Sequence, residues 1–165
     1  MRLLLIPVAW LLGFGLLAPT SQAQELSISL ELPVIETAQY YRPYVAVWVE
    51  DEAQQSVRLI ALWRKEPDWL KDIRRFWRKI GRSETELVDA RTGATRTPGR
   101  YQLSWDGLDD AGKPVPAGQY TLLVEASREQ GGRSLQRQIF QWGGAAQHYT
   151  QEAMPELGEL KITLN

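Results

Sequence analysis

The chain has 165 residues, of which 19 are basic and 20 acidic, and this near-neutral balance argues against nucleic acid as its partner. It contains no cysteine, which excludes disulfides, iron–sulfur clusters, thiol catalysis and c-type haem attachment. His148 is its only histidine and lies in a polar segment, so we expect a solvated side chain, no metal site and no Ser-His-Asp hydrolase.

The N-terminus has the pattern of a secretory signal peptide. Met1-Arg2 forms a short positive region, residues 3–17 are apolar, and Ser21-Gln22-Ala23 is a small-x-small cleavage site. The apolar run is short for a transmembrane span. We therefore predict a signal peptide over residues 1–23, cleavage after Ala23, and a single periplasmic domain over residues 24–165 that does not span the membrane.

Alternating or β-rich segments predict strands along most of this domain. Residues 25–33 alternate leucine or isoleucine with polar residues, and residues 44–49 and 57–63 are β-rich runs separated by a turn, which predicts a hairpin. Further strands are expected at residues 101–105, 119–126, 134–142 and 159–164. Seven short strands with turns between them favour an all-β, immunoglobulin-like β-sandwich.

One segment with a helical period interrupts the strands, and we predict an amphipathic helix over residues 68–80. Its apolar face is formed by Leu70, Ile73, Trp77 and Ile80, and its remaining surface is strongly basic. That basic surface can be a solvated cap on the sandwich. Alternatively it can bind an anionic partner such as a phosphate, a membrane surface or an acidic redox protein, through Arg74, Arg75, Arg78 or Arg82.

A seven-residue motif follows the helix, with the sequence Asp-Ala-Arg-Thr-Gly-Ala-Thr over residues 89–95. It resembles the acceptor motif of extracytoplasmic flavin transferases, and each constrained position is filled: Asp89, Thr92, Gly93, Ala94 and Thr95. The resemblance implies a covalent cofactor, FMN, attached through its phosphate to the hydroxyl of Thr95. The alternative is a surface loop, because this stretch is rich in turn-forming residues.

The chemistry of attachment explains these residue types. A threonine hydroxyl is a weak nucleophile, so the loop must enter the active site of a flavin transferase that activates it. Gly93 and Ala94 keep the backbone slim and allow an unusual turn, and Asp89 could bind the transferase or its magnesium ion. Most tryptophans should be core residues. If one lies beside the flavin, the helix suggests Trp69 or Trp77.

The segment of residues 105–120 contains Asp-Gly and Ala-Gly turns followed by a Pro-x-Pro connection and Gly118. It resembles the strand-turn-strand of the immunoglobulin-like domain of flagellar hook-capping proteins. We expect Tyr120 to pack inward and the carboxylates of Asp106, Asp109 and Asp110 to cap turns. Their spacing does not match a calcium loop.

Taken together, residues 25–164 resemble a family of predicted periplasmic proteins, domain of unknown function 2271. The stretches that carry the resemblance are residues 43–51, 59–63, 88–95, 98–101 and 105–120. The resemblance implies a periplasmic location and association with flavin transferases and PepSY-type membrane proteins linked to iron reduction or uptake. The leading interpretation is thus an FMN-bearing electron relay, more an electron-transfer protein than an enzyme. The alternative is a cofactor-free adaptor that binds another envelope protein through sheet edges or the basic helix.

Overall fold

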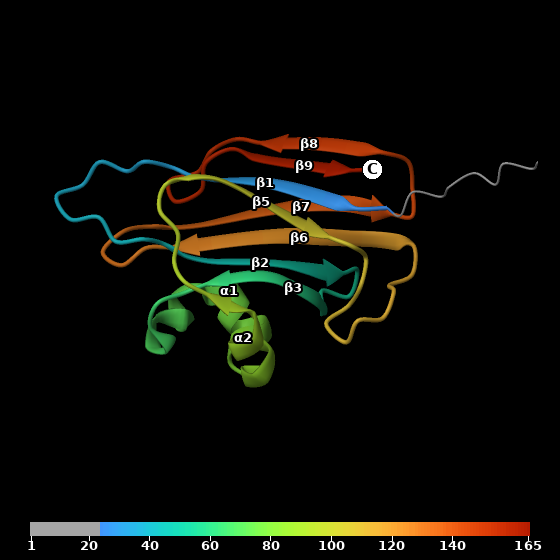
Figure 1. Cartoon of the computed structure of the whole chain (residues 1–165), viewed down its shortest axis with the longest axis horizontal. Helices are drawn as coiled ribbons and strands as arrows, with labels where there is room; N and C mark the ends of the chain where they lie inside the picture. Colours follow the sequence, from blue (N-terminus) through green and yellow to red (C-terminus); the bar gives the residue numbers. More distant parts are fainter. Residues whose placement is uncertain (1–23) are drawn as a thin grey trace, which may run out of the picture.

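The computed structural model describes residues 24–165, and the predicted signal peptide lies outside this range. Two β-sheets face each other (Figure 1). The first has the order β5-β1-β9-β8 and the second β4-β3-β2-β6-β7. The strand bounds are β1 Leu26–Leu32, β2 Tyr44–Asp51, β3 Ser56–Trp63, β4 Thr92–Gly93, β5 Gly99–Trp105, β6 Gly118–Ser127, β7 Arg133–Trp142, β8 Gln147–Gln151 and β9 Leu160–Leu164. The predicted all-β sandwich is confirmed, while its immunoglobulin-like character stays a prediction. No helix in the described range is long and apolar enough to cross a membrane.

The main core lies between the two sheets. Strand β1 alternates buried and half-buried residues, as predicted, and it pairs antiparallel with β5 and β9. The predicted β2–β3 hairpin is confirmed by an antiparallel register from Val45↔Trp63 to Glu50↔Ser56. Trp105 is 1% exposed and its ring contacts those of Tyr120, Phe140 and Trp142. Burial of these large aromatic surfaces, together with the aliphatic residues around them, stabilises the sandwich.

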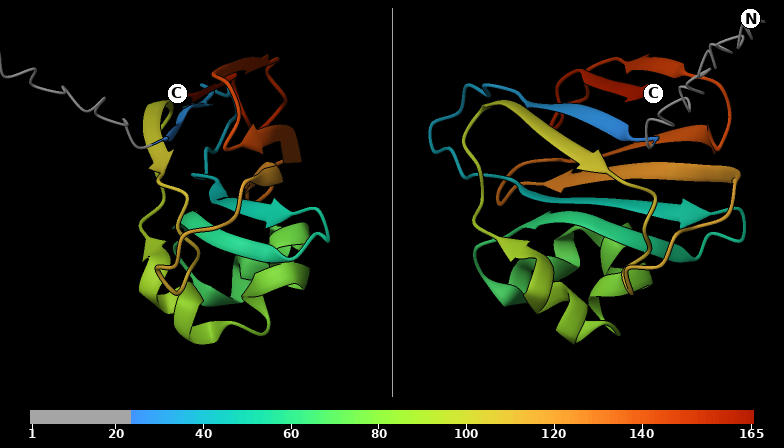
Figure 2. Two further views of the ribbon diagram at one scale, coloured as in Figure 1. Left: turned by 90° about the vertical axis from the view of Figure 1, so that its right-hand side faces the viewer. Right: turned by 45° about the vertical axis from the view of Figure 1, so that its right-hand side comes forward.

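A second core lies on the outer face of the five-stranded sheet, where a helical layer covers β2, β3 and β6. The helical layer lies below this sheet in Figures 1 and 2. It consists of the 3-10 helix η1 (Pro67–Asp72), α1 (Arg74–Phe76), the π-helical turn η2 (Trp77–Gly81) and α2 (Thr85–Arg91). Strand residues including Trp48 and Leu62 pack there against Leu70, Ile73, Phe76 and Ile80. The sheet is therefore buried on both faces, which explains why β2 is apolar along nearly its whole length.

The predicted helix over residues 68–80 is not continuous, and this corrects the sequence-based expectation. Ile73 has φ −80° and ψ 78°, which lies outside the helical region and separates η1 from α1. The buried carboxylate of Glu125 explains the break, because it accepts hydrogen bonds from the backbone N–H groups of Arg75 (3.0 Å) and Phe76 (2.8 Å). These donors would otherwise be unsatisfied at a new helix start.

Three elements were not expected from the sequence: α2, β4 and β8. Helix α2 carries only Leu87 and Val88 as apolar contacts to the layer, too few for a helical period to be visible. The polar segment around His148 forms β8, a sheet-edge strand without buried residues. The His148 side chain is solvent-exposed as expected, with Nδ1 3.3 Å from the Thr163 hydroxyl.

The turn segment of residues 105–120 has the predicted local structure. Gly107 has φ 77°, and a Cβ there would lie 2.1 Å from the Trp142 ring, so only glycine fits. Carboxylates of Asp106, Asp109 and Asp110 accept backbone N–H groups of the turn and of Leu59. Tyr120 is 5% exposed and packs inward.

Candidate functional site

The seven residues of the candidate acceptor motif are divided among a helix, a short strand and a loop. Asp89 lies in the last turn of α2, Thr92 and Gly93 form β4, and Thr95 lies in the segment that leads to β5. This segment passes from the five-stranded sheet to the four-stranded sheet at one end of the sandwich (Figures 1 and 2). Helix and strand therefore fix the beginning of the motif, while its end crosses between the two sheets.

Arg64, directly after β3, holds the first half of the motif in place. Its guanidinium lies 3.1 Å from the carboxylate of Asp89 and donates from Nε to the Thr92 hydroxyl at 3.1 Å. Its backbone N–H donates to the Gly93 carbonyl at 2.9 Å. The Thr92 hydroxyl in turn donates to the Val88 carbonyl at 2.7 Å. Thr92 thus has a structural role that leaves its hydroxyl no free capacity as a donor.

Gly93 does not adopt the unusual turn geometry that its small size suggested. It is extended and pairs in parallel with Trp63, and it is not among the glycines with positive φ. A Cβ at this position would lie 3.5 Å from the Trp63 ring, which is an ordinary contact. The fold therefore tolerates a larger residue at Gly93, and any need for glycine must come from a step other than folding.

Thr95 is half-buried and differs from the exposed Thr92 in its hydrogen bonding. Within residues 24–165, its hydroxyl has no hydrogen-bond partner. The residues that follow are held: the Arg96 guanidinium lies over the Trp63 ring at 5.5 Å, and the Tyr101 hydroxyl donates to the Thr97 carbonyl at 2.7 Å. The backbone on both sides of Thr95 is anchored, so its hydroxyl is presented from a defined position.

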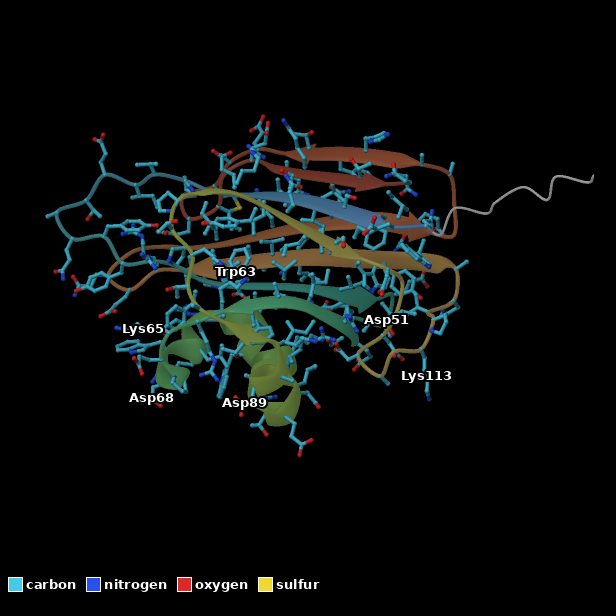
Figure 3. All side chains as sticks on the ribbon, in the orientation of Figure 1. Asp51, Trp63, Lys65, Asp68, Asp89 and Lys113 are labelled. Atoms are coloured by element: carbon cyan, nitrogen blue, oxygen red, sulfur yellow. The ribbon has the colours of Figure 1, made fainter. Side chains whose placement is uncertain are left out.

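Thr95 lines a cavity of about 320 Å³ at this end of the sandwich. The cavity is formed by the β1–β2 loop, the β3–η1 connection, η1 and the β6–β7 turn, which gather at the left-hand end in Figure 1. Lys65 and Asp68 are labelled toward this end in Figure 3, whereas Asp89 lies nearer the middle and Asp51 and Lys113 lie toward the other end. The lining residues are Tyr40, Tyr41, Arg42, Tyr44, Lys65, Glu66, Trp69, Asp72, Thr95, Ser127 and Glu129.

Polar contacts hold two of the aromatic side chains that line the cavity, Tyr44 and Tyr40. The Tyr44 hydroxyl accepts the backbone N–H of Glu66 at 2.7 Å, which ties the β3–η1 connection to β2. Tyr40 lies 5.8 Å from the guanidinium of Arg128, which the buried carboxylate of Glu156 holds at 2.9 Å. Burial raises the pKa of Tyr40 above 10.0, although the nearby Arg128 charge acts in the opposite direction. The side chain of Tyr40 is therefore uncharged at physiological pH.

Of the two tryptophans that the sequence suggested beside a flavin, only one lines the cavity of Thr95. Trp69 lines it with Thr95 and is 44% exposed, the most exposed tryptophan in the described range. Trp77 instead faces a different hollow, which it shares with Arg64 and Asp89. Sequence reasoning missed the tyrosines at positions 40, 41 and 44, although three tyrosines within five residues are an unusual signal.

The arginines of the predicted basic face are dispersed. Arg75 is 17% exposed and its guanidinium lies 2.5 Å from the buried carboxylate of Glu50, so it is not on the free surface. Arg74 and Arg78 are exposed, and Arg74 lines a hollow that shares Trp69 and Asp72 with the Thr95 cavity. Arg82 lies in the hollow of Trp77 and Asp89. None of the four lines the Thr95 cavity, whose basic lining residues are instead Arg42 and Lys65.

Fold and cavity together define an all-β sandwich protein with a ligand-sized site among its end loops. The chain belongs to the family described as Predicted periplasmic protein (DUF2271), whose model matches residues 25–159. The family resemblance seen in the sequence is thereby confirmed. Neither a curated protein nor a solved structure matches the chain.

Proposed function

We propose that this chain is a periplasmic carrier of covalently attached FMN, esterified to Thr95, and that it relays electrons in an extracytoplasmic redox or iron-reduction system. The family description supports the periplasmic setting. A flavin transferase would load the chain, and a PepSY-type membrane reductase is the suggested electron donor. Bound FMN supplies the one- and two-electron chemistry that the side chains of a cysteine-free chain lack.

The observation that carries this proposal is the contrast between the two threonines of the motif. The hydroxyl of Thr92 is bonded to Val88 and Arg64, whereas that of Thr95 has no hydrogen-bond partner in the described range, and Thr95 lines an aromatic cavity. An acceptor hydroxyl must be free to attack phosphorus, and of these two threonines the one that the motif designates has the hydroxyl without a hydrogen bond in the described range.

The attachment step makes clear what the chain must provide. The Thr95 oxygen attacks the flavin-side phosphorus of a flavin adenine dinucleotide, the Oγ–P bond forms, and the pyrophosphate P–O bond breaks with release of AMP. The hydroxyl proton passes to a base of the transferase. Thr95 supplies only the nucleophilic oxygen, so no base of this chain needs to lie beside it.

The residues around Thr95 also fit the attached group. Cofactor sites are commonly apolar and aromatic cavities of about 300–1,000 Å³, and this one has a volume of about 320 Å³ with four aromatic lining residues. Thr95 would hold the phosphate at the cavity edge. Lys65 and Arg42 are the lining cations available to a phosphate group there.

The test is co-expression of the full chain with a flavin transferase, followed by intact mass and in-gel flavin fluorescence. We expect a mass increase of one FMN and a fluorescent band, both lost in Thr95→Val and retained in Thr95→Ser. Thr97→Val is the matched control, because Thr97 lies in the same loop two residues away but outside the motif. Unmodified wild-type protein from a host with an active transferase would contradict the proposal.

A cofactor-free adaptor is the second candidate, and two surface features favour it. Strand β7 is an edge strand with Ile139 54% exposed, and the exposed Arg74 and Arg78 add a basic surface on the helical layer. An exposed strand edge can bind an extended segment of another protein. A colourless native protein of unaltered mass, co-purifying with an envelope partner, would support this function instead of the relay.

A further inference from the structure

The aromatic cavity next to Thr95 suggests where the flavin ring itself would lie, a question that the motif does not address. We infer that the cavity is a cradle for the isoalloxazine ring, with Trp69 as the stacking surface. The inference rests on the proposed FMN attachment and adds a non-covalent binding site to it. The ribityl chain is a flexible tether, so a ring joined to Thr95 has access to a cavity that Thr95 itself lines.

The exposure of Trp69 is the first argument. The other tryptophans of the sandwich, including Trp48 and Trp105, are at most 9% exposed, and Trp77 is partly buried. Trp69 leaves 44% of its surface in water although it lies on η1, next to buried Leu70, and lines the cavity. A large aromatic surface left uncovered beside a cavity is typical of a ligand contact, because stacking would remove it from water.

The contacts that hold two of the lining tyrosines are the second argument. Tyr44 is fixed through Glu66, and Tyr40 lies against Arg128, which Glu156 holds in a buried ion pair with 8% and 3% of the two side chains exposed. These contacts exist without any ligand, so the tyrosine wall does not have to be ordered on binding. A preformed wall lowers the entropic cost of holding a planar ring.

The charge of the lining is the third argument, and it distinguishes the ring from the phosphate. Glu66, Asp72 and Glu129 outnumber Arg42 and Lys65, so the lining is on balance acidic. A phosphate inside the cavity would face this excess of negative charge, whereas the oxidised ring is neutral. The arrangement therefore fits the ring within the cavity and the phosphate at its edge, on Thr95.

Flavin emission measures the stacking directly, because an indole in contact with the ring quenches its fluorescence. The full chain is loaded by co-expression with a flavin transferase, and the mass establishes one FMN per chain. Emission per bound flavin is then compared between folded protein and the same sample unfolded in guanidinium chloride. We expect the folded protein to be several-fold dimmer, and Trp69→Leu to recover most of that loss with its FMN mass unchanged.

Trp77→Leu is the matched control, since Trp77 belongs to the same helical layer but faces another hollow. Its emission should equal that of wild type, and far-ultraviolet circular dichroism checks that both variants are folded. A loaded wild-type protein as bright when folded as when unfolded overturns the cradle and leaves the FMN attachment standing. Equal recovery in both variants also overturns it. A wild-type chain without the FMN mass overturns the attachment and, with it, the cradle.

Discussion

The two halves of the candidate acceptor motif are held very differently, although they are adjacent in the sequence. Residues 89–93 are bonded to Arg64 through a carboxylate, a hydroxyl and a backbone carbonyl. Thr95, two residues further along, has a hydroxyl without a partner in the described range and lines a cavity. On the proposed function, the first half of the motif fixes the position of the segment and the second half presents the acceptor hydroxyl.

The largest loss of stability is expected on substitution of Trp63, which contacts the motif and the residues that follow it. Trp63 is 6% exposed, pairs with Gly93, and contacts Tyr101 and Arg96. We expect Trp63→Ala to lower the free energy of unfolding by about 3–5 kcal/mol, because it leaves a cavity under the motif. Urea unfolding followed by circular dichroism measures this. A loss below that of a surface substitution would show that the motif does not depend on Trp63.

Substitutions of the two threonines should have smaller effects on the free energy of unfolding, and these two effects should differ. Thr92→Val removes two hydrogen bonds, and we expect it to lower the free energy of unfolding by about 1 kcal/mol. Thr95→Val removes none in the described range and should change it by less than about 0.5 kcal/mol, while abolishing FMN attachment. Urea unfolding of unloaded protein gives both values. The contrast between the halves fails if the two variants lose equal stability.

The ion pair between Asp89 and Arg64 should contribute still less. The Asp89 side chain is 75% exposed, and exposed pairs typically contribute about 0.2–1 kcal/mol that salt screens. We expect Asp89→Asn to lower stability by about 0.5 kcal/mol at low ionic strength and to slow FMN loading. The stability difference should vanish at high salt. Unaltered loading would limit Asp89 to a structural role.

The smallest stability effect is expected at Gly93. Because a Cβ there makes only an ordinary contact with Trp63, Gly93→Ala should change the free energy of unfolding by less than about 0.5 kcal/mol. FMN loading, measured as a time course of in-gel fluorescence, should nevertheless become slower if a slim backbone must enter the transferase. Loading at the wild-type rate would mean that glycine is not required for entry.

Sequence patterns predicted the sandwich better than the site. Strands such as β1 and β3 are visible because burial imposes a period of two or a β-branched run, and their observed bounds match the predictions within two residues at each end. Strand β8 is exposed on alternate residues and half-buried on the others, so it carries no apolar signal. Helix α2 is short and has few apolar contacts, which also hides it.

The cavity could not be predicted, because it is formed by residues from the β1–β2 loop, η1, the β4–β5 segment and the β6–β7 turn. Their proximity depends on how the two sheets close, which no local pattern encodes. The sequence suggested Trp69 or Trp77 as a neighbour of the flavin, which stays a prediction, and the structure places Trp69 in the cavity that Thr95 also lines. The tyrosines within residues 40–44 show that the composition of a segment between predicted elements carries information that strand and helix periods do not.

The pairing of β4 with β3 has a consequence for how another protein could reach Thr95. It is the one parallel pair of the described strands, lies at a sheet edge, and spans only Leu62↔Thr92 and Trp63↔Gly93. A strand pairing of only two residue pairs can open locally with a smaller free-energy cost than global unfolding. On the proposed function, such opening together with loss of the Arg96–Trp63 contact would let the segment around Thr95 enter the transferase, while the two facing sheets remain intact.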